Sequence, residues 1–455
     1  YDYPRVQGLA EMMNSYGVIH NDAEVVSKIV ASQAHHKKID GHAPGLQGKD
    51  LDTYVAAGVY SDHECATMED ALAKLQRGQF IMIREGTAAR NLEALAPLLT
   101  PQYAERCMFC TDDKHPSDLL EKGHIDYIAR EAINKYGVDP IIAVKAACHH
   151  ASRYFLLNNR GAIAPGYLAD FAVIDNFKDF NVEMVFKKGV LYWNNGELRD
   201  FEAPKIEEYL DKRAHDTFHV STLTPDDFRD TRQRGVLGMV PGEIITTDNG
   251  YADHVDLEKD ILKIAVVERH KGTHHIGLGY IQGYGLKSGA VATSISHDSH
   301  NIIVVGTNSA DMAFAANYIV EHHGGIVVVE NGTVKGSVVL EIAGIMSDRP
   351  LTEVNDQLEA AKDAAFTLGV SRGIDPFREF CYTYLICCPR WRWEDEALFQ
   401  SPARGGWDAA AWFSAQVQCL HRPVPGREIP GQRLFCRRCP HPGQPPGGGR
   451  AGHLL

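Results

Sequence analysis

The sequence lacks the features typical of membrane-spanning and nucleic-acid-binding proteins. Its 455 residues contain no apolar run of about 18 residues, which argues against a transmembrane helix. Lys and Arg number 46 against 59 Asp and Glu, giving a net charge of −13, so no basic surface for nucleic acid is expected. These absences favour an enzyme that acts on a small molecule, with no membrane or nucleic-acid partner.

The first residues, YDYPRVQGLAE, have neither an initiator Met nor the basic and apolar profile of a signal peptide. We expect them to be the interior of a longer protein. Cysteine is scarce before residue 377, where only Cys65, Cys107, Cys110 and Cys148 occur. This usage suits a reduced enzyme, so we expect a cytoplasmic location, and a homo-oligomer is left open.

Residues 1–155 alternate short apolar runs with helical segments, as βα repeats with a parallel sheet do. Thr67 and Asp70 form a capping-box pattern, and Gly78 is placed to end the helix that follows. The next runs, QFIMIRE and RCMFC, predict two buried strands. We predict an α/β fold in which this segment is part of a TIM-type barrel.

Two further segments have other patterns. Residues 156–216 hold short apolar runs between turn signals such as Asn194-Asn195-Gly196, which predicts a small β element and a charged linker. Residues 217–376 contain four apolar strand-like runs and an amphipathic helix ending near Gly369, which predicts a separate C-terminal α+β domain. The glycine-rich run GLGYIQGYGLKSG has no phosphate-binding spacing and predicts turns.

The last 79 residues, 377–455, differ in composition from the rest. They contain ten Arg, no Lys, six of the ten Cys and a Pro/Gly-rich end. We expect this atypical tail to be disordered or translated out of frame. A zinc site is disfavoured because only one CxxC pair is present. Its ligands would be Cys419, His421, Cys436 and Cys439.

Four potential metal ligands lie at the ends of short apolar runs in residues 1–155. They are Glu11, His42, His63 and Asp112, separated by 31, 21 and 49 residues. Barrel enzymes carry their chemistry at the C-terminal ends of strands, so these side chains are expected to meet. The set suits one divalent ion, or two bridged by Glu11. Taken singly, each side chain is better explained as a cap, a surface group or a hydrogen-bonded core residue.

The strings around these ligands resemble a known family. GLAEMMN, DGHAPGL, SDHE and FCTDDKHP, followed by GAIAPGYLADFAVID, resemble the amidohydrolase superfamily, and within it the bacterial adenine deaminases. HKGTHHIGLGYIQGYGLKSGAVATSISHDSHNIIVVGTN resembles that family's C-terminal domain, so the resemblance covers about residues 1–376. It implies that residues 1–155 are the C-terminal part of a TIM-type metal-dependent hydrolase barrel. It also implies metal-dependent conversion of adenine to hypoxanthine and ammonia in purine metabolism, with two ions of manganese, iron or zinc.

The resemblance also implies a role for each ligand. Glu11 would be the strand-four carboxylate that bridges two metals, and His42 and His63 the strand-five and strand-six ligands. Asp112 would be the strand-eight carboxylate that contacts metal, deprotonates the attacking water and returns the proton to the departing ammonia.

Contacts with the purine are expected from three further residues. Asp113 follows Asp112, and His297 and His300 lie in the string HDSHN between two strand-like runs. A loop that helps to close the active site and a simple hydrogen-bonded turn explain HDSHN equally well.

The sequence departs from the family in one important respect. Amidohydrolases begin their barrel with an HxH pair on strand one, and no such pair occurs upstream of Glu11. We therefore expect a fragment with little activity by itself, since a partial barrel lacks ligands and exposes sheet edges. Two alternatives stay open: another amidohydrolase that opens a cyclic amide, as dihydroorotase does, and a catalytically inactive truncated remnant.

Overall fold

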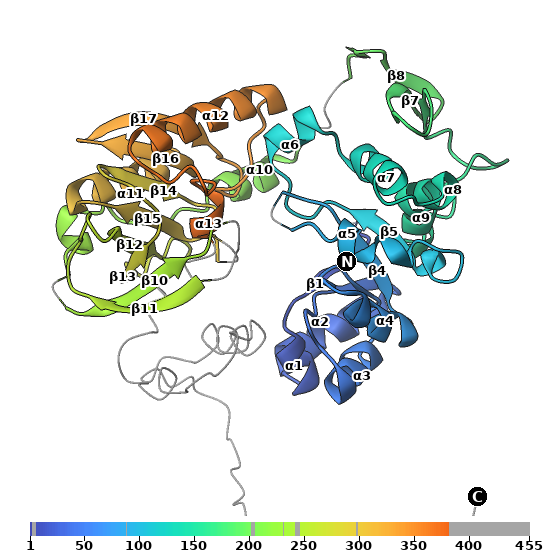
Figure 1. The fold of residues 1–455 in the computed structure, drawn as a ribbon, viewed down its shortest axis with the longest axis horizontal. Helices are drawn as coiled ribbons and strands as arrows, with labels where there is room; N and C mark the ends of the chain where they lie inside the picture. Colours follow the sequence, from blue (N-terminus) through green and yellow to red (C-terminus); the bar gives the residue numbers. More distant parts are fainter. Residues whose placement is uncertain are drawn as a thin grey trace, which may run out of the picture.

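The computed structural model describes residues 1, 6–87, 89–201, 205–230, 232–241, 246–296 and 299–381. Figure 1 shows three parts along the chain: a first region in blue to cyan, a small green sheet, and a second domain in yellow to orange beside the first region. None of the helices within these ranges is long and apolar enough to cross a membrane.

The first region is built from five parallel strands. They form a two-stranded and a three-stranded sheet. The strands are β1 (Gly8–Met12), β2 (Lys38–Gly41), β3 (Ser61–Asp62), β4 (Phe80–Arg84) and β5 (Cys107–Cys110). The helices are α1 (Ser15–Ile19), α2 (Ala23–Ala34), α3 (Gly48–Ala56), α4 (Met68–Gln76), α5 (Leu92–Leu95), α6 (Pro116–Glu121), α7 (Ile125–Asn134), α8 (Pro140–Val144) and α9 (His150–Tyr154).

The two small sheets meet at β2 and β3. The Tyr60 N–H donates to the carbonyl of Ile39 at 2.9 Å, just before β3 begins. Gly41 permits this approach, because a Cβ there would lie 2.2 Å from the Ser61 carbonyl oxygen. The five strands therefore follow one another in chain order with their C-terminal ends at a common edge.

Local sequence signals of the first region are confirmed. The runs QFIMIRE and RCMFC are β4 and β5, and Ile81 and Ile83 point into the core. Thr67 caps α4 by accepting from the Asp70 N–H at 3.2 Å. Gly78 follows that helix with φ +87°, a conformation that glycine adopts without strain.

The small sheet follows the first region. Its strands are antiparallel: β6 (Phe171–Ile174), β7 (Val182–Lys187), β8 (Val190–Asn194) and β9 (Glu197–Leu198). Asn195 and Gly196 have φ +44° and +98°, as a tight hairpin turn between β8 and β9 requires. The charged linker contains helix α10 (Glu208–His215).

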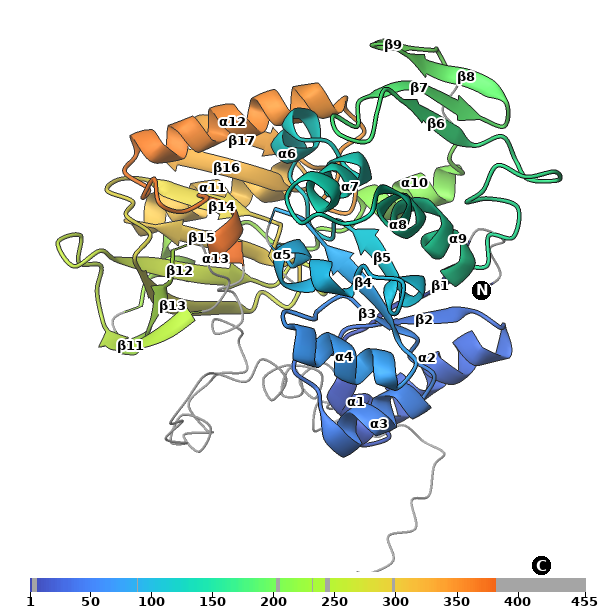
Figure 2. The same ribbon diagram turned by 45° about the vertical axis from the view of Figure 1, so that its right-hand side comes forward.

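The second domain has one eight-stranded sheet in the order β11-β10-β13-β12-β15-β14-β16-β17. The strands are β10 (Arg234–Met239), β11 (Thr246–Ala252), β12 (Ile261–Val267), β13 (Ile276–Gln282), β14 (Ala290–Thr293), β15 (Ile302–Gly306), β16 (Gly325–Glu330) and β17 (Thr333–Val339). Helix α11 (Ser309–Glu321) covers one face and α12 (Leu351–Thr367) the other, with separate apolar cores beneath them (Figure 2). The short helix α13 (Arg378–Cys381) follows.

Two expectations for the C-terminal half need correction or lie outside the described residues. The run GLGYIQGYGLKSG was expected to form turns, but its first part is strand β13, because Leu278 and Ile281 each pack into an apolar core of the sheet. Of the atypical tail, residues 377–381 are described, and Phe377 and Cys381 are buried. The remainder, with its four potential zinc ligands, lies outside the described residues.

Candidate metal centre

The four predicted ligands lie at the common edge of the parallel strands. Glu11 is the penultimate residue of β1, His42 directly follows β2, and His63 directly follows β3. Asp112 comes two residues after β5. Because parallel strands end at the same edge of a sheet, residues 101 positions apart in the sequence are brought into one site.

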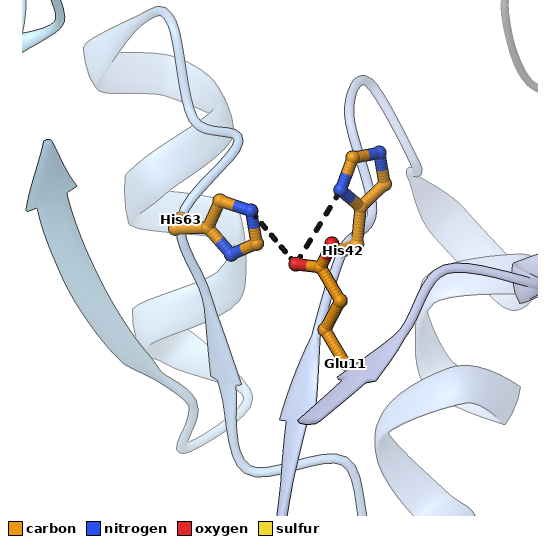
Figure 3. Close-up of side chains that lie close together, drawn as sticks. All are labelled: Glu11, His42 and His63. Atoms are coloured by element: carbon orange, nitrogen blue, oxygen red, sulfur yellow. Dashed lines mark ion pairs between the residues drawn. The ribbon is translucent and has the colours of Figure 1, made fainter. Parts of the chain in front are cut away.

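Figure 3 shows Glu11, His42 and His63 pointing toward one another. Glu11 Oε2 lies 2.9 Å from His63 Nε2 and 3.7 Å from His42 Nδ1. His63 Nε2 lies 3.9 Å from Asp112 Oδ2. The donor atoms of Glu11, His42 and His63 are all within 4.8 Å of one another, which is a spacing that one ion can bridge.

The site contains two further residues, Glu64 and Arg84, that were not predicted. Glu64 Oε1 lies 3.2 Å from His63 Nε2 and forms a second potential metal-binding group with His63 and Asp112. Arg84 ends β4 and donates to Asp112 Oδ2 at 2.6 Å and to Glu64 Oε2 at 2.9 Å. The sequence contained a signal for Arg84. It is a polar residue near the end of QFIMIRE, the one predicted strand to which no ligand was assigned.

The carboxylates and imidazoles of the site change one another's pKa. Burial raises the pKa of Glu11, but the neighbouring imidazoles of His42 and His63 outweigh this effect and lower the pKa to about 2. Burial lowers the pKa of His63, but the carboxylates of Glu11 and Glu64 outweigh this and raise it to about 10. A divalent cation at this position would replace the His63 proton as the partner of these carboxylates.

The residues fit a divalent metal ion. His42 Nδ1 is buried, and among the described residues it has no hydrogen-bond partner. Leaving a buried polar group unsatisfied costs about 1–3 kcal/mol, and coordination to a metal would remove that cost. Two imidazoles together with carboxylates are ligands that zinc, iron and manganese accept.

The backbone around Asp112 orients its carboxylate. Asp112 has φ +53°, in the left-handed region that Asp tolerates better than most residues. Its Oδ1 accepts the Asp113 N–H at 2.9 Å, while Oδ2 contacts Arg84 and His63. One carboxylate oxygen is thus used to hold the turn, and the other is directed into the site.

The predicted purine contacts have different positions. Asp113 is exposed, and its carbonyl accepts from the Thr87 N–H at 2.9 Å, which joins the loops after β4 and β5. His297 lies outside the described residues. His300 is not a member of the ligand cluster; its N–H donates to the Ser296 carbonyl at 2.6 Å within the second domain. Their substrate-binding role stays a prediction.

The second domain contacts the loops next to the site. Arg378 Nη1 donates to the Thr87 carbonyl at 3.1 Å, and Asp375 Oδ2 lies 3.8 Å from His115 Nδ1. Figures 1 and 2 both place α6 beside α12, which belongs to the second domain. The loop that carries Asp112 is therefore supported from both parts of the protein.

The two parts of the protein match two different family domains. Residues 6–192 match the amidohydrolase family, and residues 243–403 match the adenine deaminase C-terminal domain. The adenine deaminase of Desulfatibacillum aliphaticivorans is 42% identical over 405 residues, which cover 87% of this chain and 70% of that protein. The chain belongs to the adenine deaminase family. Adenine deaminases of Nitratidesulfovibrio vulgaris strain DP4 (88% and 70% covered) and Dehalococcoides mccartyi (87% and 70% covered) are each 41% identical.

Solved structures resemble this adenine deaminase family member more distantly. A β-aspartyl dipeptidase from Fervidobacterium islandicum AW-1 has a TM-score of 0.35 and 17% identity, covering 44% of this chain and 60% of its own. An adenosine deaminase from Xanthomonas campestris with bound zinc has a TM-score of 0.32 and 15% identity, covering 42% and 52%. The predicted family and mixed α/β class are confirmed by the family matches and by the strands and helices described above. The C-terminal match runs to residue 403, beyond the limit of 376 expected from the resemblance.

Proposed function

We propose that the protein catalyses the metal-dependent hydrolytic deamination of adenine to hypoxanthine and ammonia. The observation that carries this proposal is the 42% identity to an adenine deaminase along 87% of the chain. The clustering of Glu11, His42, His63 and Asp112 supports it, because hydrolysis at a ring carbon needs activated water and a carboxylate that transfers a proton.

Each side chain has a distinct part in the proposed reaction. Glu11, His42, His63 and Asp112 would hold the metal, which supplies Lewis-acid activation of water. Asp112 takes a proton from the attacking water and delivers it to the amino group, which leaves as ammonia. Arg84 holds the Asp112 carboxylate through its hydrogen bond to Oδ2, so that the base faces the reacting atoms.

Finer features of the fold and the cofactor are part of the same proposal. The five parallel strands with ligands at one edge support a TIM-type barrel for residues 1–155, with the small sheet and linker in 156–216 and the second domain in 217–376. The second group formed by His63, Glu64 and Asp112 supports two ions of manganese, iron or zinc. A role in purine catabolism and a cytoplasmic location also remain predictions.

Ammonia release from adenine tests the proposed reaction. We expect the protein, supplied with manganese, to convert adenine to hypoxanthine with release of one ammonia per turnover. Ring opening of dihydroorotate without adenine turnover would contradict the proposal and favour the alternative amidohydrolase.

A further inference from the structure

A lysine is fully buried beneath the candidate metal centre. Lys74 lies on α4, and its side chain is 0% exposed. Its ammonium group donates to the Ala43 carbonyl at 2.7 Å, to Asp70 Oδ2 at 2.9 Å and to Asp62 Oδ2 at 3.0 Å. An ammonium has three protons, so each of them has an acceptor.

Asp62 completes a connection between the two histidine ligands. Its Oδ1 accepts the Ala43 N–H at 2.7 Å, and its Oδ2 accepts the Glu64 N–H at 3.0 Å. Ala43 directly follows His42, while Asp62 and Glu64 flank His63. Ala43 is thus held at both its N–H and its carbonyl, and the two ligand-bearing loops are joined through one buried ion pair.

A metal ion is not the natural occupant of this buried cluster. Asp62, Cys65 and Asp70 have donor atoms close enough to share an ion. However, Lys74 Nζ contacts all three of them, including Cys65 Sγ at 3.6 Å. The ammonium group of the chain itself supplies the positive charge there.

Stability alone is a poor reason for this arrangement. Desolvation of a buried ion pair offsets much of its attraction, and well-packed apolar side chains are often as stabilising or more so. What an ion pair adds is a fixed geometry, and this pair fixes the backbone on both sides of the metal-binding edge. The rings of His42 and His63 lie edge to face with their centroids 5.4 Å apart.

We propose that Lys74 and Asp62 are positioning residues whose buried ion pair sets the separation of His42 and His63 required to bind a divalent metal ion. The inference rests on the metal centre of the proposed function. It assigns a role in metal affinity to two residues that are not among the proposed ligands. Partners that orient metal ligands from outside the coordination shell typically change metal affinity about 10–100-fold when removed.

The variant Asp62→Asn tests the inference directly. Asn keeps the shape of the side chain and one oxygen acceptor, but that oxygen cannot serve Ala43, Glu64 and Lys74 together. In the full 455-residue chain, zinc alone is titrated in competition with a chelating dye. We expect binding of zinc to weaken about 10–100-fold. An unchanged zinc affinity would overturn the inference.

A second variant separates positioning from stability. Lys74→Met combined with Asp62→Asn and Asp70→Asn removes the ammonium and both carboxylates that pair with it, so no unpaired charge of this cluster remains buried. We expect this triple variant to fold with the far-ultraviolet circular dichroism of the parent and still to bind zinc about 10–100-fold more weakly. Parental zinc affinity in the triple variant would show that the ion pair contributes to folding only, and would refute the inference even if Asp62→Asn alone did not fold.

A matched control lies on the same helix. Arg77, the C-terminal capping residue of α4, pairs with Asp52 at 2.5 Å on the surface, and Arg77→Met should leave zinc affinity unchanged. Zinc binding by the parent chain and by His63→Ala distinguishes failure of the proposed metal centre from failure of the positioning role. If the parent does not bind zinc, or binds it equally after His63→Ala, the proposed metal centre and this inference both fail. If the parent binds through His63 and Asp62→Asn binds equally, only the inference fails.

Discussion

The sheets of the first region and of the second domain differ in strand direction. In the first region the strands are parallel, and their ends bring Glu11, His42, His63 and Asp112 to one edge. In the second domain most neighbouring strands are antiparallel, so successive strand ends alternate between edges. Within the described part of the chain, every group of side chains that could hold a metal lies in the first region. Strand direction therefore decides which sheet can collect a ligand set.

The buried cationic side chains of the two parts have different hydrogen-bond partners. Lys74 pairs with two carboxylates beneath the candidate metal centre. Arg269 is 2% exposed in the second domain, where it donates to the carbonyls of Thr217 and Ala343 at 2.9 Å and lies over the Phe218 ring. Burial lowers the pKa of Arg269 to about 10. Its contacts join segments of the second domain, whereas those of Lys74 join the ligand loops.

The largest expected effect on activity comes from removing the Asp112 carboxylate of the first region. Asp112→Ala should lower kcat/KM for adenine deamination by about 10²–10⁴-fold or more, because it removes the proposed general base, which is also a proposed metal ligand. Asp253→Ala is the matched change on the surface of the second domain, where Asp253 pairs only with His254 in the described contacts. Steady-state ammonia release checks both variants. An undiminished rate for Asp112→Ala would show that the base is misassigned.

The second effect concerns metal content. His63→Ala should abolish stoichiometric metal binding, because His63 contacts Glu11, Glu64 and Asp112. His274 also pairs with a carboxylate, Asp227 at 3.0 Å, but it lies in the second domain away from the ligand group. His274→Ala should keep the parental metal content in elemental analysis. An equal loss of bound metal in both variants would contradict the assignment of the metal centre to the first region.

A core substitution in the second domain should affect stability and leave metal binding intact. Ile303 on β15 is fully buried, and Ile303→Ala should destabilise the second domain by about 2–5 kcal/mol through lost burial and a cavity. Thermal unfolding gives the change, and zinc titration of the folded variant is the control. A large loss of zinc affinity in folded Ile303→Ala would mean that the second domain determines the geometry of the metal centre.

The smallest effect is expected at the surface of the first region. The Arg77–Asp52 ion pair is partly exposed, and such pairs contribute about 0–1 kcal/mol. Arg77→Met should therefore shift the thermal midpoint only slightly. A destabilisation as large as that of Ile303→Ala would contradict this ranking.

The meeting of the four side chains could be predicted from the sequence because each lies at, or within two residues of, the C-terminal end of a recognisable strand. His42 and His63 directly follow β2 and β3, so local pattern and barrel geometry together were sufficient. Helix α4 was also predictable, since Thr67 and Gly78 provide its end signals within the chain itself. Strand β13 was missed because its glycines suggest turns, while its packing between β10 and β12 depends on distant segments.

The supporting contacts of the site depend on the folded chain. Lys74 lies in a segment that resembles an ordinary amphipathic helix, and only the fold brings its ammonium to Ala43 and Asp62. Arg84 likewise gains its role from Glu64 and Asp112, which follow the neighbouring strands β3 and β5. Such partners are separated by 12 to 31 residues and follow no fixed spacing.

Anomalous X-ray diffraction from zinc-loaded crystals tests the metal centre most directly. We expect a peak at the common edge of β1, β2 and β3, about 2.0–2.1 Å from a nitrogen of His42 and of His63 and in contact with Glu11. The density should be lost in crystals of His63→Ala. A zinc peak at other side chains, with His42 and His63 uncoordinated, would contradict the proposed metal centre.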